Sequence, residues 1–195
     1  MIAFLRGSFY IKSPAQVVVD VNGVGYDCQI SLHTYSAISE KESGQLFTYL
    51  HITENAQTLY GFFDMSEKEL FTQLISVSGV GAATARMMLS GLRPEEIIKA
   101  IVQGNARVLE GVKGIGRKTA ERLVLELRDK LGKNITDAGF NPLSVVHNVE
   151  NDALNALVSL GIPKPNAEKA IKNVINTGDS NILLEDLIKK ALKSI

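Results

Sequence analysis

A glycine motif occurs twice in this chain of 195 residues, each time directly before a stretch with helical periodicity. The clearer copy reads GVKGIGRKTAER (111–122), and the weaker copy reads GVGAATAR (79–86). Glycine allows the positive φ of a tight turn and carries no Cβ that would keep a ligand off the backbone. The repeat therefore predicts two helix–turn–helix corners with accessible backbone. The paired glycines are Gly79 and Gly81 in the first copy, and Gly114 and Gly116 in the second.

The start of each helix after these glycines is a candidate anion site. First-turn N–H groups lack partners within the helix and point outward with the positive end of its dipole. Arg117, Lys118 and Arg122 surround the second site, with the Thr119 hydroxyl nearby, and Arg86 is the basic residue nearest the first. Such a site grips a phosphate without reading a base. The predicted DNA-binding residues are Gly79, Val80, Gly81, Arg86, Gly114, Ile115, Gly116, Arg117, Lys118, Thr119 and Arg122.

Two other interpretations of the glycine motifs are possible, an ordinary helix corner and a nucleotide-binding loop. Ordinary helix corners with a glycine C-cap have similar local sequences, but two copies joined by one helix, with bases after the second, favour a phosphate grip. A nucleotide P-loop is nearly matched by Gly111, Gly116, Lys118 and Thr119. Arg117 occupies the lysine position, however, and the preceding NARVLE is polar rather than a buried strand, so ATP binding is not expected. Valine in place of Gly116 is expected to resist the positive φ of the turn and to block the backbone.

Periodicity divides the chain into three structured segments. Residues 1–63 have β-type runs, including two around Asn22-Gly23, a dipeptide typical of tight hairpins, and five short strands suit an OB-like β-barrel. Residues 64–133 have helical period, with Asp64 or Ser66 as a first cap, and are expected to form a tandem helix-hairpin-helix DNA-binding domain.

The remainder is expected to be a linker over 134–151 and a three-helix bundle over 152–195. The fold class expected is thus α+β and multi-domain, with an N-terminal barrel, a helical domain and a C-terminal bundle. The last helix is expected to carry an apolar stripe of Leu184, Leu187, Ile188, Ala191 and Leu192.

Charge and composition narrow the class of function. The formal net charge is zero, but the segment 64–133 holds twelve Lys and Arg against nine Asp and Glu, while the flanking segments are net acidic. The basic excess thus coincides with the glycine motifs, as expected for binding to nucleic acid. No apolar run approaches the roughly 18 residues of a membrane span, and the start lacks a signal peptide. We expect a cytoplasmic protein that does not enter a membrane.

Metal or cofactor chemistry has little support in the sequence. Cys28 is the only cysteine, and a lone strand cysteine is typically a packed core thiol. His33, His51 and His147 are scattered without ligand spacing, so neither a metal site nor a cofactor is expected.

With these motifs in order, the whole chain resembles the RuvA family, the Holliday-junction-binding subunits of bacterial branch-migration complexes. The resemblance covers MIAFLRG, VNGVGY, TENAQTLYGF, SGVGAATA, KGIGRKTAERLVLEL and ALNALVSLG. It implies a homotetramer, which can pair into an octamer, whose tandem hairpins hold the minor-groove backbones of four duplex arms. It also implies that the C-terminal bundle binds the RuvB ATPase motor, that the RuvC resolvase is a further partner, and that the chain has no catalytic residues. Resemblance alone suggests motor contacts at Leu154, Leu157, Leu160 and Gly161, and ALNALVSLG equally fits a plain core helix.

The chain departs from the family pattern at two places. The family loop matching 53–57 usually bears two adjacent acids, the acidic pin, whereas here Glu54 is followed by Asn55. The first hairpin usually has a lysine soon after its second glycine, whereas here Ala82 and Ala83 follow. We therefore expect the second hairpin to carry more of the binding and the pin to be weaker.

Two functions of other classes remain as alternatives. A structure-selective nuclease or lyase could use the same hairpin grip, but it needs clustered metal-binding carboxylates or a reactive lysine, and no such spacing is found. A barrel that binds single strands would need exposed aromatic residues on a basic groove, and the first 63 residues are net acidic.

Overall fold

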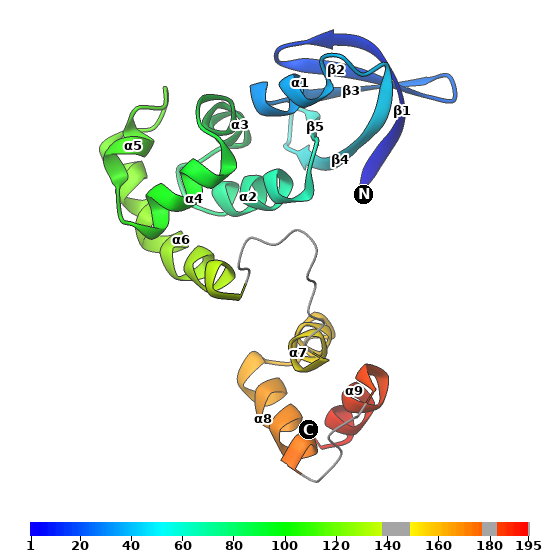
Figure 1. The fold of residues 1–195 in the computed structure, drawn as a ribbon, viewed down its shortest axis with the longest axis vertical. Coiled ribbons are helices and arrows are strands. Elements are labelled where there is room, and N and C mark those ends of the chain that lie inside the picture. Colours follow the sequence, from blue (N-terminus) through cyan, green and yellow to red (C-terminus); the bar gives the residue numbers. More distant parts are fainter. Residues whose placement is uncertain (138–148, 177–182, 195) are drawn as a thin grey trace. The chain divides into compact units, whose positions relative to one another are not determined.

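The N-terminal residues form a closed barrel of five strands, as expected (Figure 1). Its strand order is β1-β2-β3-β5-β4; β3 and β5 are parallel, and the other neighbouring pairs are antiparallel. Asn22 and Gly23, at φ of 52° and 86°, make the predicted tight turn. This computed structural model describes residues 1–137, 149–176 and 183–194. The strands are β1 (Phe4–Ser13), β2 (Gln16–Val21), β3 (Val24–Ile30), β4 (Ser43–Ile52) and β5 (Gln57–Phe62).

Successive side chains along each strand point alternately inward and outward, and the inward ones fill the barrel. Val17, Val19, Cys28 and Leu46 have no exposed surface and form its core with Ile30. Burial, with a smaller effect of Asp27, raises the pKa of the Cys28 thiol to about 12. A thiol of that kind is unreactive, so Cys28 is the core residue that the sequence predicts.

A short helix, α1 (Leu32–Ile38), follows β3 and was not expected from the sequence. Ser31 caps it by accepting a hydrogen bond from the Thr34 N–H at 3.0 Å. Ile38 anchors it in the barrel core. A helix of seven residues offers too short a window for a periodicity signal, since one turn takes 3.6 residues.

The helical domain has the expected caps. Asp64, rather than Ser66, caps the first helix and accepts from the Glu67 N–H at 2.7 Å. An apolar core continuous with Tyr60 and Phe62 of β5 joins these helices to the barrel. The helices are α2 (Met65–Ile75), α3 (Ala82–Gly91), α4 (Pro94–Val102), α5 (Ala106–Glu110) and α6 (Arg117–Asp137).

The C-terminal unit consists of α7 (Val149–Ser159), α8 (Lys164–Asn176) and α9 (Leu184–Lys193), and it has its own apolar core. Only part of the apolar stripe on α9 is buried. Leu187 and Ala191 are fully buried, but Leu184 and Leu192 remain 37% and 43% exposed, because a narrow helix face suffices to close a bundle of three short helices.

The linker boundaries also differ from expectation. Helix α6 runs four residues beyond 133, to Asp137, and α7 already begins at Val149. The rest of the expected linker, 138–148, lies outside the described residues. None of the described helices combines the length and the apolar character that crossing a membrane requires.

Candidate nucleic-acid interface

The two glycine turns have the same hydrogen-bond pattern. In the first turn, the Val80 N–H donates to the Val77 carbonyl at 3.0 Å, and in the second the Ile115 N–H donates to the Val112 carbonyl at 3.0 Å. Each turn thus closes after the preceding helix, α2 or α5, and opens into α3 or α6. The prediction of two like helix corners is confirmed at the level of single hydrogen bonds. The segment before the second turn is a helix, not the strand that a P-loop follows.

The first glycine of each pair has the special conformation. Gly79 and Gly114 lie at φ of 91° and 94°. Gly81 has an ordinary φ of −83°, and Gly116 is not among the glycines with positive φ. No atom lies within 4 Å of a Cβ built on either of these second glycines. The expectation that a positive φ would resist valine at Gly116 is therefore wrong, and that strain belongs to Gly114.

The helix after each glycine pair begins with backbone N–H groups that have no partner within the helix. The first N–H to bond back within α3 is that of Ala85, to the Gly81 carbonyl at 2.9 Å, and within α6 that of Ala120, to the Gly116 carbonyl at 3.0 Å. The three N–H groups before each of these residues have no partner inside the helix. Neither first turn carries an acidic residue. Both helix starts can therefore accept an anion.

The side chains of Val80 and Ile115, two residues predicted from the sequence to bind DNA, lie in the protein core. Both side chains are only 5% exposed and belong to the core of the helical domain. Their N–H groups already donate within the turns. They act as anchors, because each fixes a turn to the core while the neighbouring glycine backbone stays at the surface.

The two turns pack against each other reciprocally. A Cβ built on Gly79 would lie 3.9 Å from the Thr119 hydroxyl oxygen, and one built on Gly114 would lie 4.0 Å from the Thr84 methyl carbon. Thr84 and Thr119 are equivalent positions of the two copies. Such an exchange of contacts arises when two copies are related by a local two-fold axis. The two anion sites are therefore neighbours on one surface.

The basic side chains of the second copy differ in their freedom. Arg117 donates to Glu121 at 2.8 Å, and this hydrogen bond raises the pKa of Arg117. Arg122 donates to the Ser78 carbonyl of the first turn at 3.2 Å and so ties the two turns together. Lys118 is exposed and has no hydrogen bond or ion pair with any residue that the structure describes. Of these three basic side chains, it is the one not engaged by another described protein group.

The side chain of Arg86, another residue predicted from the sequence to bind DNA, forms hydrogen bonds to the barrel. Its Nη1 donates to the Ala15 carbonyl at 2.8 Å and to Gln29 Oε1 at 3.0 Å, both on the barrel. The side chain is half-buried. The sequence showed only a base after a glycine pair; the barrel carbonyls that hold it come from residues more than 50 positions away.

Glu54 and Asn55 lie at the tip of the β4–β5 hairpin. Thr53 closes this loop: its N–H donates to the Ala56 carbonyl at 2.9 Å, and its hydroxyl oxygen accepts from the Ala56 N–H at 3.2 Å. Both tip side chains are exposed. The loop therefore presents one carboxylate and one amide per chain to whatever approaches this end of the barrel.

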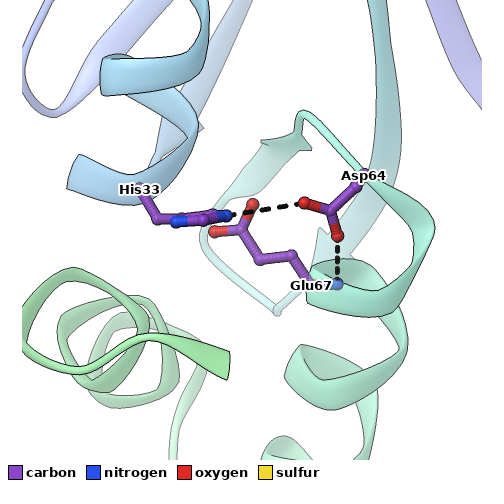
Figure 2. A group of neighbouring side chains, drawn as sticks. All are labelled: His33, Asp64 and Glu67. Atoms are coloured by element: carbon purple, nitrogen blue, oxygen red, sulfur yellow. Dashed lines mark hydrogen bonds and ion pairs between the residues drawn. The ribbon is translucent and has the colours of Figure 1, made fainter. Parts of the chain in front are cut away.

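One polar cluster was missed by the sequence reasoning. Figure 2 shows His33 of α1 facing Asp64 and Glu67. The ligand atoms of these three residues lie within 4.8 Å of one another. Both oxygens of the Glu67 carboxylate accept hydrogen bonds from Ser31 and Thr34, while Asp64 accepts from the Glu67 N–H and faces His33 Nε2 at 3.5 Å. Protein donors thus already serve these oxygens. His147, the third scattered histidine, lies outside the described residues.

The four residues suggested as motor contacts fall into different environments. Leu157 is fully buried in the bundle core, so its side chain offers no surface. Leu160 is 64% exposed and Leu154 is half-buried. Gly161 ends α7 with a φ of 90°, and the following Ile162 N–H returns to the Leu157 carbonyl. Among the four, Leu160 is the residue that offers apolar surface.

Three protein families match successive parts of the chain. The RuvA N terminal domain matches residues 1–61, the SAM-like Helix-hairpin-helix tandem matches 71–129, and the RuvA C-terminal domain matches 148–195. These matches follow the barrel, the paired turns and the C-terminal bundle.

Relatives match along the whole length. Proteins named Holliday junction branch migration complex subunit RuvA from Cytophaga hutchinsonii and Amoebophilus asiaticus are each 45% identical and cover 99% of this chain and at least 99% of their own. The protein of the same name from Bacteroides thetaiotaomicron is 42% identical over the full length of both chains. With all three domains in order and this identity from end to end, the chain belongs to the RuvA family.

Proposed function

We propose that this chain is the junction-binding subunit of a Holliday junction branch migration complex, acting in recombination and DNA repair. The carrying observation is the pair of adjoining helix starts, each with free N–H groups and no acid in its first turn. Such sites bind the phosphates of DNA whatever its base sequence. Full-length relatives bear the name of that complex subunit. A homotetramer would present four such pairs to four duplex arms.

The chain would bind the junction and fix its geometry, and its partners would supply the catalytic activities. We propose that the C-terminal bundle binds the RuvB ATPase motor, with Leu160 on its contact surface, and that the RuvC resolvase and a second tetramer are further partners. These bindings would take place in the cytoplasm. A nuclease or lyase is disfavoured, because the described carboxylate cluster lies in the connection between barrel and helices. Its oxygens already accept hydrogen bonds from protein groups.

The proposed function predicts a strong preference for branched DNA. Full-length protein should bind a four-way junction at least tenfold more tightly than a linear duplex of equal length, whatever the sequence, because the junction engages several subunits at once. Affinity should fall steeply with salt as counterions are released. Fluorescence anisotropy at two salt concentrations measures both. Equal affinity for the two DNAs at matched salt would contradict the proposal.

Lys118→Ala should lower the affinity for four-way junctions of every sequence by the same factor. Loss of one phosphate contact per subunit lowers the slope of log affinity against log salt by about one per contact. The control is Lys130→Ala, which removes the same charge from an exposed position further along α6. Salt titrations of both variants decide the matter: a slope that stays at the wild-type value in Lys118→Ala rules out the contact.

Glu54→Gln should raise junction affinity and reduce discrimination against duplex, since a carboxylate at the tip of the hairpin repels phosphates within a Debye length of about 8 to 10 Å. Asn55→Asp should act in the opposite direction. The effect of each exposed charge should be about 1 kcal/mol or less. Junction-to-duplex affinity ratios at low and high salt measure it, and unchanged ratios at low salt would show that this loop has no pin role.

A further inference from the structure

A hydrogen-bonded connection joins the barrel to the helical domain, and we refer to it as the seam. On the barrel side it consists of residues 29–34 together with Ala15, and on the helical side of Glu67, Arg86 and Ser90. The Leu32 N–H donates to Ser90 Oγ at 3.1 Å. The seam therefore holds the start of α1 between α2 and α3.

Glu67 is the central group of the seam. Its side chain has no exposed surface, and its two oxygens accept from the Ser31 and Thr34 hydroxyls. Burial raises the pKa of Glu67, and these hydrogen bonds act in the opposite direction. A buried carboxyl is costly to desolvate and a poor way to gain stability. Its hydrogen bonds do have strict directions, so they fix geometry.

The Ser31 and Thr34 hydroxyls donate to the Glu67 carboxylate, which in its ionised form has no hydrogen to give. Ser31 Oγ already accepts from the Thr34 N–H at 3.0 Å, and Thr34 Oγ1 already accepts from the Phe63 N–H at 2.9 Å. Each of the two hydroxyls therefore accepts from a backbone N–H and donates to the carboxylate. An amide in place of that carboxylate would turn an NH₂ group toward one of these donors, and the network would have to rearrange.

Apolar packing holds the two parts together independently of the seam. Phe71 of α2 packs against Tyr60 and Phe62 of β5, with ring centroids 5.0 and 4.9 Å apart. Such contacts are tolerant of small rotations, whereas hydrogen bonds weaken steeply when misaligned. Packing thus accounts for adhesion, and the polar seam accounts for the angle.

We infer that Glu67 and Arg86 are positioning residues that set the angle between the paired turns and the barrel, and thereby the preference for junctions. This inference rests on the proposed function. A duplex needs only the turns, which lie on the helical domain. A junction must meet the turns of several subunits at once, so its binding depends on the angle between the turns and the barrel in each subunit. Rotation at the seam therefore weakens junction binding and spares duplex binding.

The test compares Glu67→Gln and Arg86→Ala with two matched controls in the full-length protein. Glu69→Gln makes the same charge change at an exposed position of α2, and Lys99→Ala removes a cation from an exposed position of α4. Affinities for a four-way junction and for duplex are measured at one salt concentration. We expect each seam variant to lose tenfold or more in junction affinity with less than a twofold change for duplex, and the controls to keep the wild-type ratio.

Other outcomes overturn the inference. If Arg86→Ala weakens junction and duplex equally and lowers the salt slope by about one, Arg86 is a phosphate contact. If both seam variants keep the wild-type ratio, the seam is only structural. If Glu67→Gln fails to fold, Arg86→Ala decides alone, because Arg86 is half-buried at the edge of the packed core. A wild-type protein without junction preference would overturn the proposed function and this inference together.

Discussion

Valine in place of Gly114 is expected to reduce both junction and duplex affinity on the order of 100-fold, corresponding to about 3 kcal/mol. Gly114 holds a φ of 94°, where a side chain costs about 1–3 kcal/mol and a β-branched one is a clear outlier. Either the strain is retained or the turn reopens, and reopening displaces the free N–H groups at the start of α6. The nearby Thr84 methyl group makes the first copy sensitive to the same change. Anisotropy titrations and thermal melting measure the two effects.

Gly116→Ala is the matched control for this variant. Gly116 lies two residues further on, lacks a positive φ and has no atom within 4 Å of an added Cβ. This variant should therefore have the melting temperature of the wild type. Any loss of DNA affinity would come only from the added methyl group, which would lie between the backbone and a bound phosphate. If Gly114→Val bound DNA as well as Gly116→Ala, the turn conformation would not be what presents the anion site.

A chain ending at Gly139 is expected to keep junction binding and to lose all stimulation of the RuvB motor. The barrel and the helices through α6 form one compact unit with their own core, and α7, α8 and α9 form another. Removing the second unit leaves both glycine turns intact. The end point lies beyond Asp137, because a stop at 133 would cut into α6.

Motor stimulation is measured as junction-dependent ATP hydrolysis by the purified RuvB protein. The matched control is full-length Leu160→Ala, which should weaken stimulation without removing the bundle, since this side chain is exposed. Full stimulation by the shortened chain would place the motor contact on the first unit. Hydrolysis of ATP by the full-length chain alone would contradict its role as the non-motor subunit.

Local sequence signals predicted much of the fold. Asn22-Gly23 marked the first hairpin because both residues need positive φ, and Asp64 marked a helix start because its carboxylate can accept from the first turn. The five strands and both glycine turns follow from signals of this range. Helix α1 was missed because it is short and because the bonds that hold its start come from distant residues such as Glu67.

Site details depended on contacts that no local pattern contains. Lys118 and Arg86 read alike in the sequence, as basic residues after a glycine pair, yet one is free and the other bonds the barrel. Val80 and Ile115 lie between the exposed glycines, yet their side chains are needed in the core. Which glycine of a pair has positive φ likewise depends on how the preceding helix ends.

The reciprocal packing of the two turns has a consequence for strand polarity. The two strands of a duplex run antiparallel and are exchanged by dyads perpendicular to the duplex axis. A protein surface with its own local dyad can align with one of these, so that each strand meets the same backbone donors in the same direction. The side chains break this equivalence, because Arg117 and Lys118 begin one helix where Ala82 and Ala83 begin the other. On the proposed function, one strand of each arm would be held by Lys118 and backbone amides and its complement by backbone amides alone. The complement would then slide more freely during branch migration.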